Sequence, residues 1–570
     1  MKNRAFLSIP CAVALSLALP PAAGAQVPAG GEFRVNTYTT SAQRRPAVAK
    51  RPNGDFVITW HSDGPDGSFY GIRGQRYNRA GVAQGGEFQV NTYTTEYQYW
   101  PRMTVNARGD FVVTWSSYGQ DGSFWGSFGQ RFNAAGTALG AEFRTNTYTV
   151  GYQFLPVPAM AANGSFVVVW NSFYPGQDGS GGAVIGRRYD TAGNPVGGEF
   201  QVNTYTTGYQ TYGAVAMTPT GEFVVVWESP QDGNAYGIVG KRYTAAGVPI
   251  GGEFIINSTT TGYQVTPAIA VNPNGSFVVT WHSPDGSSYG VRARLFDASG
   301  TAVGADFAVN SYTTGLQYNY QVTADAQGNF VVSWASETGD GSNYAVFGQR
   351  FSRTGTRRGA EFRVNTYTTS DQSMPALAAD LVGNFDVTWR SLGQDGSLSG
   401  VYAQRYGGLF PTALRVDNAG NGVWEPGEQN IPMRPTWLNV NGAAQTFGGT
   451  LGSATAPTGV SVAIPDPSAS YGTVANNTAA ECVDCYAISN VVNNRPAIHV
   501  DASALESITP DTLGQQKTWL LHIGASFSDV STASGFYRFI ETLLHHGITG
   551  GCSATEYCPG SSTTREQMAV

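Results

Sequence analysis

Short runs of β-branched and aromatic residues recur along most of the chain, and glycine, asparagine or aspartate bounds each of them. In the first such unit the alternation predicts a short apolar strand at residues 46–50 and a strong strand at 55–62. Asn53 and Gly54 lie between them and predict a tight hairpin turn. A third strand is expected at residues 70–77 and a fourth at 87–91. The unit is therefore a four-stranded antiparallel sheet.

The same unit occurs seven times between residues 30 and 408, at a spacing of 53 to 57 residues. Each copy contains one tryptophan: Trp60, Trp115, Trp170, Trp227, Trp281, Trp334 and Trp389. An acidic residue followed by phenylalanine recurs in step: Glu32, Glu87, Glu142, Glu199, Glu253, Asp306 and Glu361. Repeats of about this length, each with several short strands, are typical of propeller blades. Residues 30–408 resemble a seven-bladed β-propeller, and the predicted fold class is all-β.

The phase of the repeat predicts how the ring closes. Residues 32–36 form a fourth strand that precedes the first complete set, whereas the seventh set ends at residues 404–406 without one. We expect the N-terminal strand to complete the seventh blade by pairing near residues 400–406. Such closure removes an exposed sheet edge.

Residues that occur in every copy are expected to hold the blades together. One example is the aspartate of an Asp-Gly turn: Asp66, Asp121, Asp178, Asp232, Asp285, Asp340 and Asp395. A turn whose side chain bonds its own backbone is the favoured interpretation, and a calcium site at each turn is the alternative. Binding depends instead on positions that differ between copies.

Two variable positions are expected on one face of the disc. The first lies directly after each tryptophan: His61, Ser116, Asn171, Glu228, His282, Ala335 and Arg390. The second is the pair after a recurrent glutamine, such as Arg44 and Arg45 in the first copy. Aromatic, basic and histidine side chains there suit a glycan or protein ligand, with chance surface variation as the alternative. The candidate ligand-binding residues are Arg45, Tyr99, Trp100, Phe154, Tyr212, Tyr318, His61, His282 and Arg390.

Catalysis has weaker support in the sequence. Propeller glycosidases need two placed carboxylates, and Glu228 is the one carboxylate in the position after tryptophan. Glu337 lies three residues after Trp334 and is its candidate partner. The chain has no nucleophile elbow, no zinc-protease motif and no phosphate loop. We therefore expect a protein that is not an enzyme.

The first 25 residues predict an export signal. Lys2 and Arg4 precede a short apolar run at residues 12–19, and a small-residue cleavage pattern ends at Ala25. Cys11 lies inside this leader. No later stretch is long and apolar enough to span a membrane. The net charge of −7, without a basic stripe, argues against nucleic acid as a partner.

Four cysteines follow in the last hundred residues: Cys482, Cys485, Cys552 and Cys558. Export permits disulfides, and the two local pairs are the simplest of three connectivities. A loop-closing disulfide is favoured over a redox or zinc site at Cys482 and Cys485.

The repeat stops before residue 409, and residues 409–525 are predicted to form a β-sandwich of immunoglobulin-like type. Strands are expected at residues 437–440, 460–464, 497–500 and 519–523. Its first segment has a spacing that partly matches a calcium loop, although a plain acidic turn is the favoured interpretation. The candidate calcium ligands are Asp417, Asn421, Glu425 and Glu428, and no other cofactor is expected.

Residues 527–570 contain Phe-Ser-Asp-Val, a helical run at 535–546, Gly547-Ile548-Thr-Gly550 and Thr-Arg-Glu-Gln-Met at 564–568. This pattern resembles an S-layer homology (SLH) module, although only one incomplete copy is present. The resemblance implies attachment to a cell-wall or envelope polysaccharide, with Arg565 as the residue that binds the anionic polymer. His545 and His546 fit the end of a helix, without a metal.

Together these features predict an exported bacterial protein, secreted or at the cell surface. Its propeller would bind an unknown glycan or protein, and its SLH-like module would attach it to the envelope. One alternative is a secreted carbohydrate-active enzyme, either a glycosidase or a lyase, on the same propeller. The other is a purely architectural surface-layer component.

Overall fold

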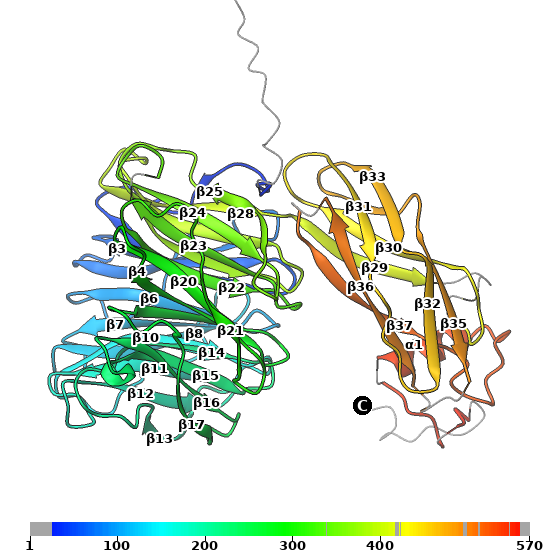
Figure 1. The fold of residues 1–570 in the computed structure, drawn as a ribbon, viewed down its shortest axis with the longest axis horizontal. Helices are drawn as coiled ribbons and strands as arrows, with labels where there is room; N and C mark the ends of the chain where they lie inside the picture. Colours follow the sequence, from blue (N-terminus) through cyan, green and yellow to red (C-terminus); the bar gives the residue numbers. More distant parts are fainter. Residues whose placement is uncertain are drawn as a thin grey trace, which may run out of the picture.

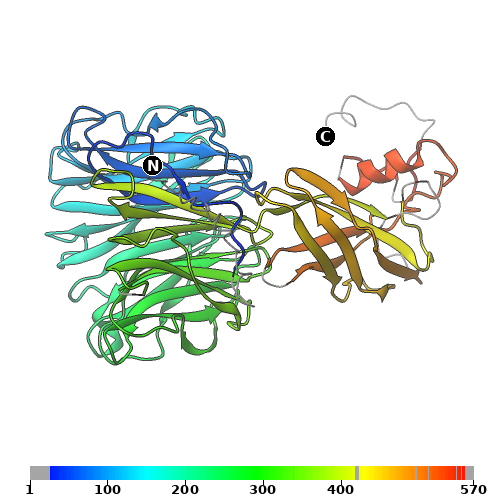
Figure 2. The same cartoon turned by 90° about the horizontal axis from the view of Figure 1, so that it is seen from above.

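The fold is described from a computed structural model of the chain. It covers residues 26–337, 339–416, 421, 423–493, 497, 499–510, 513–546, 548–553 and 555–558, without the side chain of Asn319. The predicted leader, residues 1–25, lies outside the described residues. A disc of sheets stands beside a smaller β-sandwich, and one short helix lies at the end of the sandwich that is far from the disc (Figures 1 and 2). No helix within the described parts is long and apolar enough to cross a membrane.

The disc is a seven-bladed β-propeller with four antiparallel strands in each blade. Blade 1 contains β2 (Gln43–Lys50), β3 (Phe56–Asp63), β4 (Tyr70–Tyr77) and β5 (Phe88–Gln89). Blade 2 contains β6 (Gln98–Val105), β7 (Phe111–Tyr118), β8 (Trp125–Phe132) and β9 (Phe143–Arg144). Blade 3 contains β10 (Tyr152–Met160), β11 (Phe166–Phe173), β12 (Gly182–Tyr189) and β13 (Pro195–Gln201). Blade 4 contains β14 (Thr211–Met217), β15 (Phe223–Ser229), β16 (Gly237–Tyr243) and β17 (Pro249–Ile255), with a 3-10 turn at Pro230–Asp232.

The last three blades repeat this order. Blade 5 contains β18 (Val265–Val271), β19 (Phe277–Pro284), β20 (Tyr289–Phe296) and β21 (Ala302–Ala308). Blade 6 contains β22 (Gln317–Ala324), β23 (Phe330–Glu337), β24 (Tyr344–Phe351) and β25 (Arg357–Arg363). Blade 7 contains β26 (Gln372–Ala379), β27 (Phe385–Leu392), β28 (Ser399–Tyr406) and the N-terminal β1 (Phe33–Arg34). Single parallel bridges also join neighbouring blades, for example Tyr152 with Trp125 between blades 2 and 3 and Gly182 with Tyr209 between blades 3 and 4.

The predicted ring closure is confirmed. β1 pairs with β28 in antiparallel register, with Phe33 opposite Ala403 and Arg34 opposite Tyr402. The seven repeated tryptophans are almost completely buried between the blades, which agrees with a structural role for the repeated residues.

A ring of hydrogen bonds joins each blade to the next through the recurrent acidic residue. In every blade this carboxylate accepts the backbone N–H of a residue in the preceding blade. The acceptor and donor pairs are Glu87 and Thr37, Glu142 and Thr92, Glu199 and Thr147, Glu253 and Thr204, Asp306 and Ser258, Glu361 and Ser311, and Glu32 and Thr366. The last pair closes the circle across the chain ends.

The recurrent aspartates form the expected turns. In all seven, one carboxylate oxygen accepts the backbone N–H two residues later. At Asp121 the second oxygen accepts the side-chain amide of Asn146 at 2.9 Å. The side-chain-bonded turn is thus confirmed as the local structure of this motif.

Two sheets form the β-sandwich. One contains β29 (Leu409–Val416), β30 (Ile431–Asn439), β35 (Tyr486–Val492), β32 (Val460–Asp466) and β34 (Thr478–Glu481). The other contains β33 (Ser468–Val474), β31 (Gln445–Leu451), β36 (Asp501–Thr509) and β37 (Gln516–His522). The predicted strand at residues 497–500 is wrong, because the extended segment begins at Asp501. Alternation of buried and half-buried residues over β36 places that strand at the sheet interface.

A buried carboxylate organises the core between the two sheets. Glu506 is 0% exposed, and burial raises its pKa. Its Oε1 accepts the hydroxyls of Tyr471 at 2.6 Å and Tyr486 at 2.8 Å. Its Oε2 accepts the indole N–H groups of Trp437 at 3.1 Å and Trp519 at 2.6 Å. Four donors therefore compensate for the burial of one carboxyl group.

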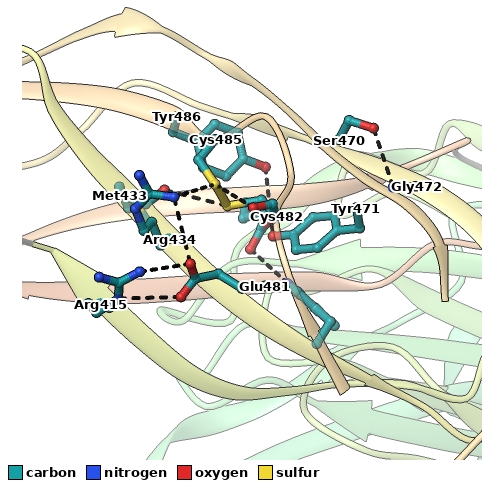
Figure 3. The surroundings of a disulfide bond; sticks show 12 residues. Arg415, Met433, Arg434, Ser470, Tyr471, Gly472, Glu481, Cys482, Cys485 and Tyr486 are labelled. Atoms are coloured by element: carbon teal, nitrogen blue, oxygen red, sulfur yellow. Dashed lines mark hydrogen bonds and ion pairs between the residues drawn. A yellow bond between two sulfur atoms is a disulfide. The ribbon is translucent and has the colours of Figure 1, made fainter. Parts of the chain in front are cut away.

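The sandwich contains the first predicted disulfide, Cys482–Cys485, which closes the loop between β34 and β35 (Figure 3). Beside it, Glu481 accepts hydrogen bonds from Arg415 and lies 3.7 Å from the Nη1 of Arg434. The second predicted pair, Cys552–Cys558, is also formed.

The sandwich is bonded to one face of the propeller disc. Asn329 donates to the Oε1 of Gln516 at 2.7 Å, and Arg350 donates to the backbone oxygen of Gly514 at 3.0 Å. Asn329 belongs to the hairpin between the first and second strands of its blade, so these contacts lie on the disc face opposite the predicted variable positions. The face that carries the variable positions has no such contact with the described part of the sandwich and is called the open face.

One helix, α1 (Tyr537–His545), follows the sandwich within the predicted 535–546 run. Tyr537, Ile540 and Leu544 on its buried side pack with Phe527 and Val530 of the preceding segment. The described part of the SLH-like pattern thus shares a small apolar core with Val423, which lies between β29 and β30 of the sandwich. Gly547 and residues 559–570, which include Arg565, lie outside the described residues.

Candidate functional site

Each inner strand of the propeller carries a β-bulge opposite its buried tryptophan. In all seven blades the register between the first and second strands shifts by one residue at this point. The second residue after the recurrent glutamine lies in this bulge and has a left-handed backbone, with φ between 49° and 57° in the six blades where it is described. These residues are Arg45, Trp100, Leu155, Tyr212, Thr266 and Met374. Left-handed φ is costly for bulky and β-branched residues, and it often marks a functional position.

The two variable positions of the repeat lie opposite each other. Across the first two strands of each blade, the residue after glutamine pairs with the residue after tryptophan. The pairs are Arg44 and His61, Tyr99 and Ser116, Phe154 and Asn171, Thr211 and Glu228, Val265 and His282, Tyr318 and Ala335, and Ser373 and Arg390. Positions that vary between copies are therefore concentrated on one face, around the axis.

A cavity of about 1010 Å³ opens at the centre of this face, among the inner strands. All six bulge residues with positive φ line it. Ten aromatic side chains contribute to its wall: Trp100, Tyr152, Phe154, Phe173, Tyr174, Tyr209, Tyr212, Tyr236, Tyr263 and Tyr320. The volume is at the upper end of the range for small-molecule sites, about 300–1000 Å³.

Glu228 is the one carboxylate among the described residues that line the cavity. It is 4% exposed, and burial raises its pKa to about 8. The backbone N–H of Thr266 donates to its Oε1 and opposes this rise. At neutral pH the carboxyl group is therefore mostly protonated and acts as a hydrogen-bond donor or acid.

His282 and Tyr320 lie next to Glu228 through the same threonine. The Thr266 hydroxyl is 3.1 Å from the Tyr320 hydroxyl and 3.3 Å from the Nδ1 of His282. Burial lowers the pKa of His282 to about 4, so its ring is neutral at pH 7. Its Nε2 is buried and has no hydrogen-bond partner among the described residues. An unsatisfied ring nitrogen at a cavity wall can bond a ligand.

The wall formed by blades 1 and 2 is basic. The Arg45 guanidinium lies 4.4 Å from the centre of the Trp100 ring, and burial lowers the pKa of Arg45 to about 10. The nearby charge of Arg102 also contributes to this lowering. Neither arginine forms an ion pair with a described acidic residue. The cavity thus combines two cations on one side with a protonated carboxyl group on the other.

The predicted site residues divide into two groups. Arg45, Trp100, Phe154, Tyr212, Glu228 and His282 line the cavity. Tyr99, Tyr318, His61, Arg390 and Glu337 do not.

The second group is held by neighbouring residues outside the cavity. His61 is buried between Tyr70 and Tyr99. Arg390 forms an ion pair with Asp371 at 3.3 Å. The Glu337 carboxylate accepts the N–H of Leu316 at 3.0 Å, so Glu228 and Glu337 do not form a pair on the cavity wall.

Sequence reasoning missed Tyr320, although the repeat contains a signal for it. Its position follows the bulge, and in five of the other six copies a proline occupies it: Pro46, Pro101, Pro156, Pro267 and Pro375. Replacement of this proline by tyrosine brings a hydroxyl group to Thr266. A departure from a repeated structural residue was the available clue.

The other predicted sites stay predictions. Asp417 lies outside the described residues. Asn421 donates its side-chain amide to Glu425 at 2.7 Å, and the N–H of Glu425 bonds Glu428 at 2.8 Å. These contacts fit an acidic turn and leave the calcium hypothesis untested.

Comparison with known proteins gives no family for this chain. No family model matches it. No curated protein matches it either.

Among solved structures, a protein of unknown function from Dyadobacter fermentans DSM 18053 aligns with a TM-score of 0.42 at 9% identity, covering 67% of this chain and 98% of its own. Polysaccharide lyase Uly1 aligns with a TM-score of 0.40 at 12% identity, covering 63% and 89%. The GH93 α-L-arabinofuranosidase of Fusarium graminearum aligns with a TM-score of 0.38 at 13% identity, covering 66% and 98%. At these values the function has to be argued from the side chains of the cavity.

Proposed function

We propose that the propeller is a carbohydrate-binding platform whose site is the cavity at the centre of its open face. The supporting observation is that bulged, left-handed residues from six blades line one cavity, whose wall contains ten aromatic rings, Trp100 and Tyr212 of the bulges among them. Aromatic faces stack on the apolar faces of sugars, and their hydroxyl groups bond sugar hydroxyls. Tyr174, Tyr209 and Tyr263 are exposed at this site, as expected for rings that await a ligand.

The ligand class is an acidic glycan. Arg45 and Arg102 face the cavity and form no ion pair with the described acidic residues. Guanidinium groups bind carboxylate and sulfate groups through paired hydrogen bonds. A protonated Glu228 adds a donor without adding a negative charge that would repel such a ligand.

The protein is exported, and residues 527–570 attach it to the cell envelope. The leader pattern at residues 1–25 and the disulfides Cys482–Cys485 and Cys552–Cys558 support an oxidising, extracellular location. The SLH-like pattern supports attachment of residues 527–570 to an envelope polysaccharide, with Arg565 as the proposed contact.

A glycan array tests the binding proposal. The full chain is expected to bind acidic oligosaccharides more tightly than neutral ones, and Arg45→Gln is expected to remove this preference. Trp100→Ala should weaken binding at least tenfold, about 1.4 kcal/mol, because it removes a stacking surface. Phe69→Ala is the matched control, since this exposed ring lies outside the cavity. Equal binding by all four proteins would contradict the proposal.

A second candidate is an enzyme that cleaves an acidic polysaccharide by elimination. The observation that favours it is the combination of a protonated Glu228 with a neutral His282 around Thr266. Elimination needs a base for the proton next to the carboxylate, an acid for the leaving oxygen and a cation at the carboxylate. His282 would be the base, Glu228 the acid and Arg45 the cation.

Turnover separates the two candidates. Elimination creates a carbon–carbon double bond at the new end of the sugar chain, which absorbs in the ultraviolet. If the protein is an enzyme, glycans that bind will yield this product, and Glu228→Gln will abolish it while retaining binding. Binding without product supports the non-catalytic platform.

A further inference from the structure

Three histidines and one aspartate meet where the sandwich contacts α1. Asp501 begins β36 and lies directly opposite His522, which ends β37. His499 lies two residues before Asp501, and His545 ends α1. One ligand atom from each of the four lies within 4.8 Å of those of the others. Half of the six histidines in the chain are thus gathered at one point.

Four of the six distances between these atoms match the edges of a metal tetrahedron. The Oδ1 of Asp501 lies 3.1 Å from the Nε2 of His499, 3.2 Å from the Nδ1 of His522 and 3.1 Å from the Nδ1 of His545. The Nε2 of His499 and the Nδ1 of His545 are 3.4 Å apart. Ligands at about 2.0–2.1 Å from a tetrahedral Zn²⁺ are about 3.3 Å from one another.

Hydrogen bonds alone account poorly for this arrangement. One carboxylate oxygen would have to accept three imidazole N–H groups, whereas an oxygen has two lone pairs. Two of these donor nitrogens, on His499 and His545, would also face each other at 3.4 Å. A cation between the four atoms removes both conflicts, because each nitrogen then presents a lone pair to it.

An independent contact fixes the orientation of His522. Its Nε2 lies 2.8 Å from the Oε2 of Glu541, a buried residue of α1. The Glu541 carboxylate also accepts the backbone N–H of Ser526 at 2.9 Å and its hydroxyl at 2.7 Å. A proton on Nε2 leaves the Nδ1 lone pair directed at the cluster. A carboxylate behind a histidine is the usual support of a metal ligand.

We propose that His499, Asp501, His522 and His545 bind one Zn²⁺ ion as a structural site. Imidazole and carboxylate ligands suit zinc, and four protein ligands are typical of structural rather than catalytic sites. The ion connects α1 to β36 and β37. It therefore fixes the C-terminal helix on the sandwich, at the end that is far from the propeller (Figure 2). If His545 binds the ion, its place at the end of a helix does not fully explain it. That explanation still fits the exposed His546.

Metal titration of the full chain tests the proposal. Protein stripped with a chelator and titrated with ZnCl₂ is expected to bind one ion per chain and to unfold at a higher temperature with zinc than without it. Cobalt in place of zinc should give the visible absorption of a tetrahedral site. His499→Ala and Asp501→Asn should weaken zinc binding at least 100-fold. Glu541→Gln should weaken it about 10- to 100-fold, because it removes the support of His522.

The matched control is His546→Ala, which removes a neighbouring exposed histidine outside the cluster. It should bind zinc as the unaltered protein does. His499 is the safest ligand to replace, because its side chain is 37% exposed and its loss should leave the fold intact. Circular dichroism of the metal-free variant checks this. No zinc binding by the unaltered protein, or equal binding by His499→Ala and His546→Ala, would overturn the proposal.

Discussion

The junction between blades 7 and 1 contains a buried ion pair that is not found at the same positions of the other junctions among the described residues. Lys50 of β2 and Asp386 of β27 are 2.8 Å apart, with side chains 2% and 0% exposed. At the six other junctions two apolar residues occupy the same positions, and each such pair belongs to one hydrophobic cluster. The pairs are Val57 and Val105, Val112 and Met160, Val167 and Met217, Val224 and Val271, Val278 and Ala324, and Val331 and Ala379. The other junctions therefore show which apolar residues could replace Lys50 and Asp386 in this fold.

Replacing one partner should be far more costly than replacing both. Lys50→Val leaves the Asp386 carboxylate buried and unpaired, and Asp386→Val leaves a buried ammonium group. Each single change should lower the free energy of unfolding by about 3–5 kcal/mol. The double variant reproduces the apolar junctions and should lie within about 1 kcal/mol of the unaltered protein, or be more stable. The Oδ1 of Asp386 has no described partner, so the pair is incompletely satisfied and its replacement is favoured.

Urea unfolding at pH 7, followed by tryptophan fluorescence, measures these differences, because nine of the twelve tryptophans belong to the propeller. A double-mutant cycle then gives the coupling energy of the pair, expected to exceed about 4 kcal/mol. Val57→Thr and Val105→Thr at an apolar junction provide a matched control, since neither has an ionic partner to lose. If the double variant is as unstable as the two single changes added together, this explanation of the closing junction is wrong.

Three further changes test individual groups. In the unaltered protein, folded Glu228 keeps its proton at pH values where the unfolded chain, with an ordinary carboxyl pKa of 4.5, has released it. The free energy of unfolding therefore falls between about pH 4.5 and 8. Glu228→Gln should remove this pH dependence. Urea unfolding at pH 5 and pH 8.5 should show a loss of about 3–5 kcal/mol in the unaltered protein that the variant lacks. Glu506→Ala leaves four buried donors without an acceptor and should destabilise the sandwich by at least about 4 kcal/mol in thermal unfolding. Glu506→Gln should destabilise it less, because its amide oxygen can still accept the indole N–H groups. Glu32→Ala removes the bond to Thr366 that closes the ring and should cost about 1–2 kcal/mol in the same urea assay.

The sequence predicts the propeller well because each level of the pattern agrees. The spacing of Trp60 and its counterparts gives the number of blades, and Asn53-Gly54 gives the turn of the first hairpin. The unmatched strand at residues 32–36 gives the closure. Each local pattern is weak alone, but its recurrence in seven copies makes the prediction of the fold reliable.

The cavity could not be predicted because its geometry depends on left-handed backbone conformations for which the sequence has no marker. Left-handed φ is usually marked by glycine or asparagine, but here it occurs at residues such as Trp100, Tyr212 and Thr266. In blade 2 the one-residue shift at the bulge decides which of two neighbouring side chains faces the axis. For this reason Trp100 lines the cavity while Tyr99 packs against Tyr97.

The cluster of three histidines around Asp501 could not be predicted from the sequence either. His499 and His545 are 46 residues apart and belong to no motif of fixed spacing. Only the pairing of β36 with β37 and the packing of α1 bring their rings together. The strand predicted at residues 497–500 was misplaced for a different reason, since short apolar runs between turns do not fix strand ends.

The most direct test of the proposed function is a crystal structure of the protein with the tightest-binding acidic oligosaccharide from the array. We expect a sugar ring stacked within the cavity near Trp100 and Tyr212, with its acidic group at Arg45. Density for the ligand on any other surface, with the cavity residues untouched, would contradict it.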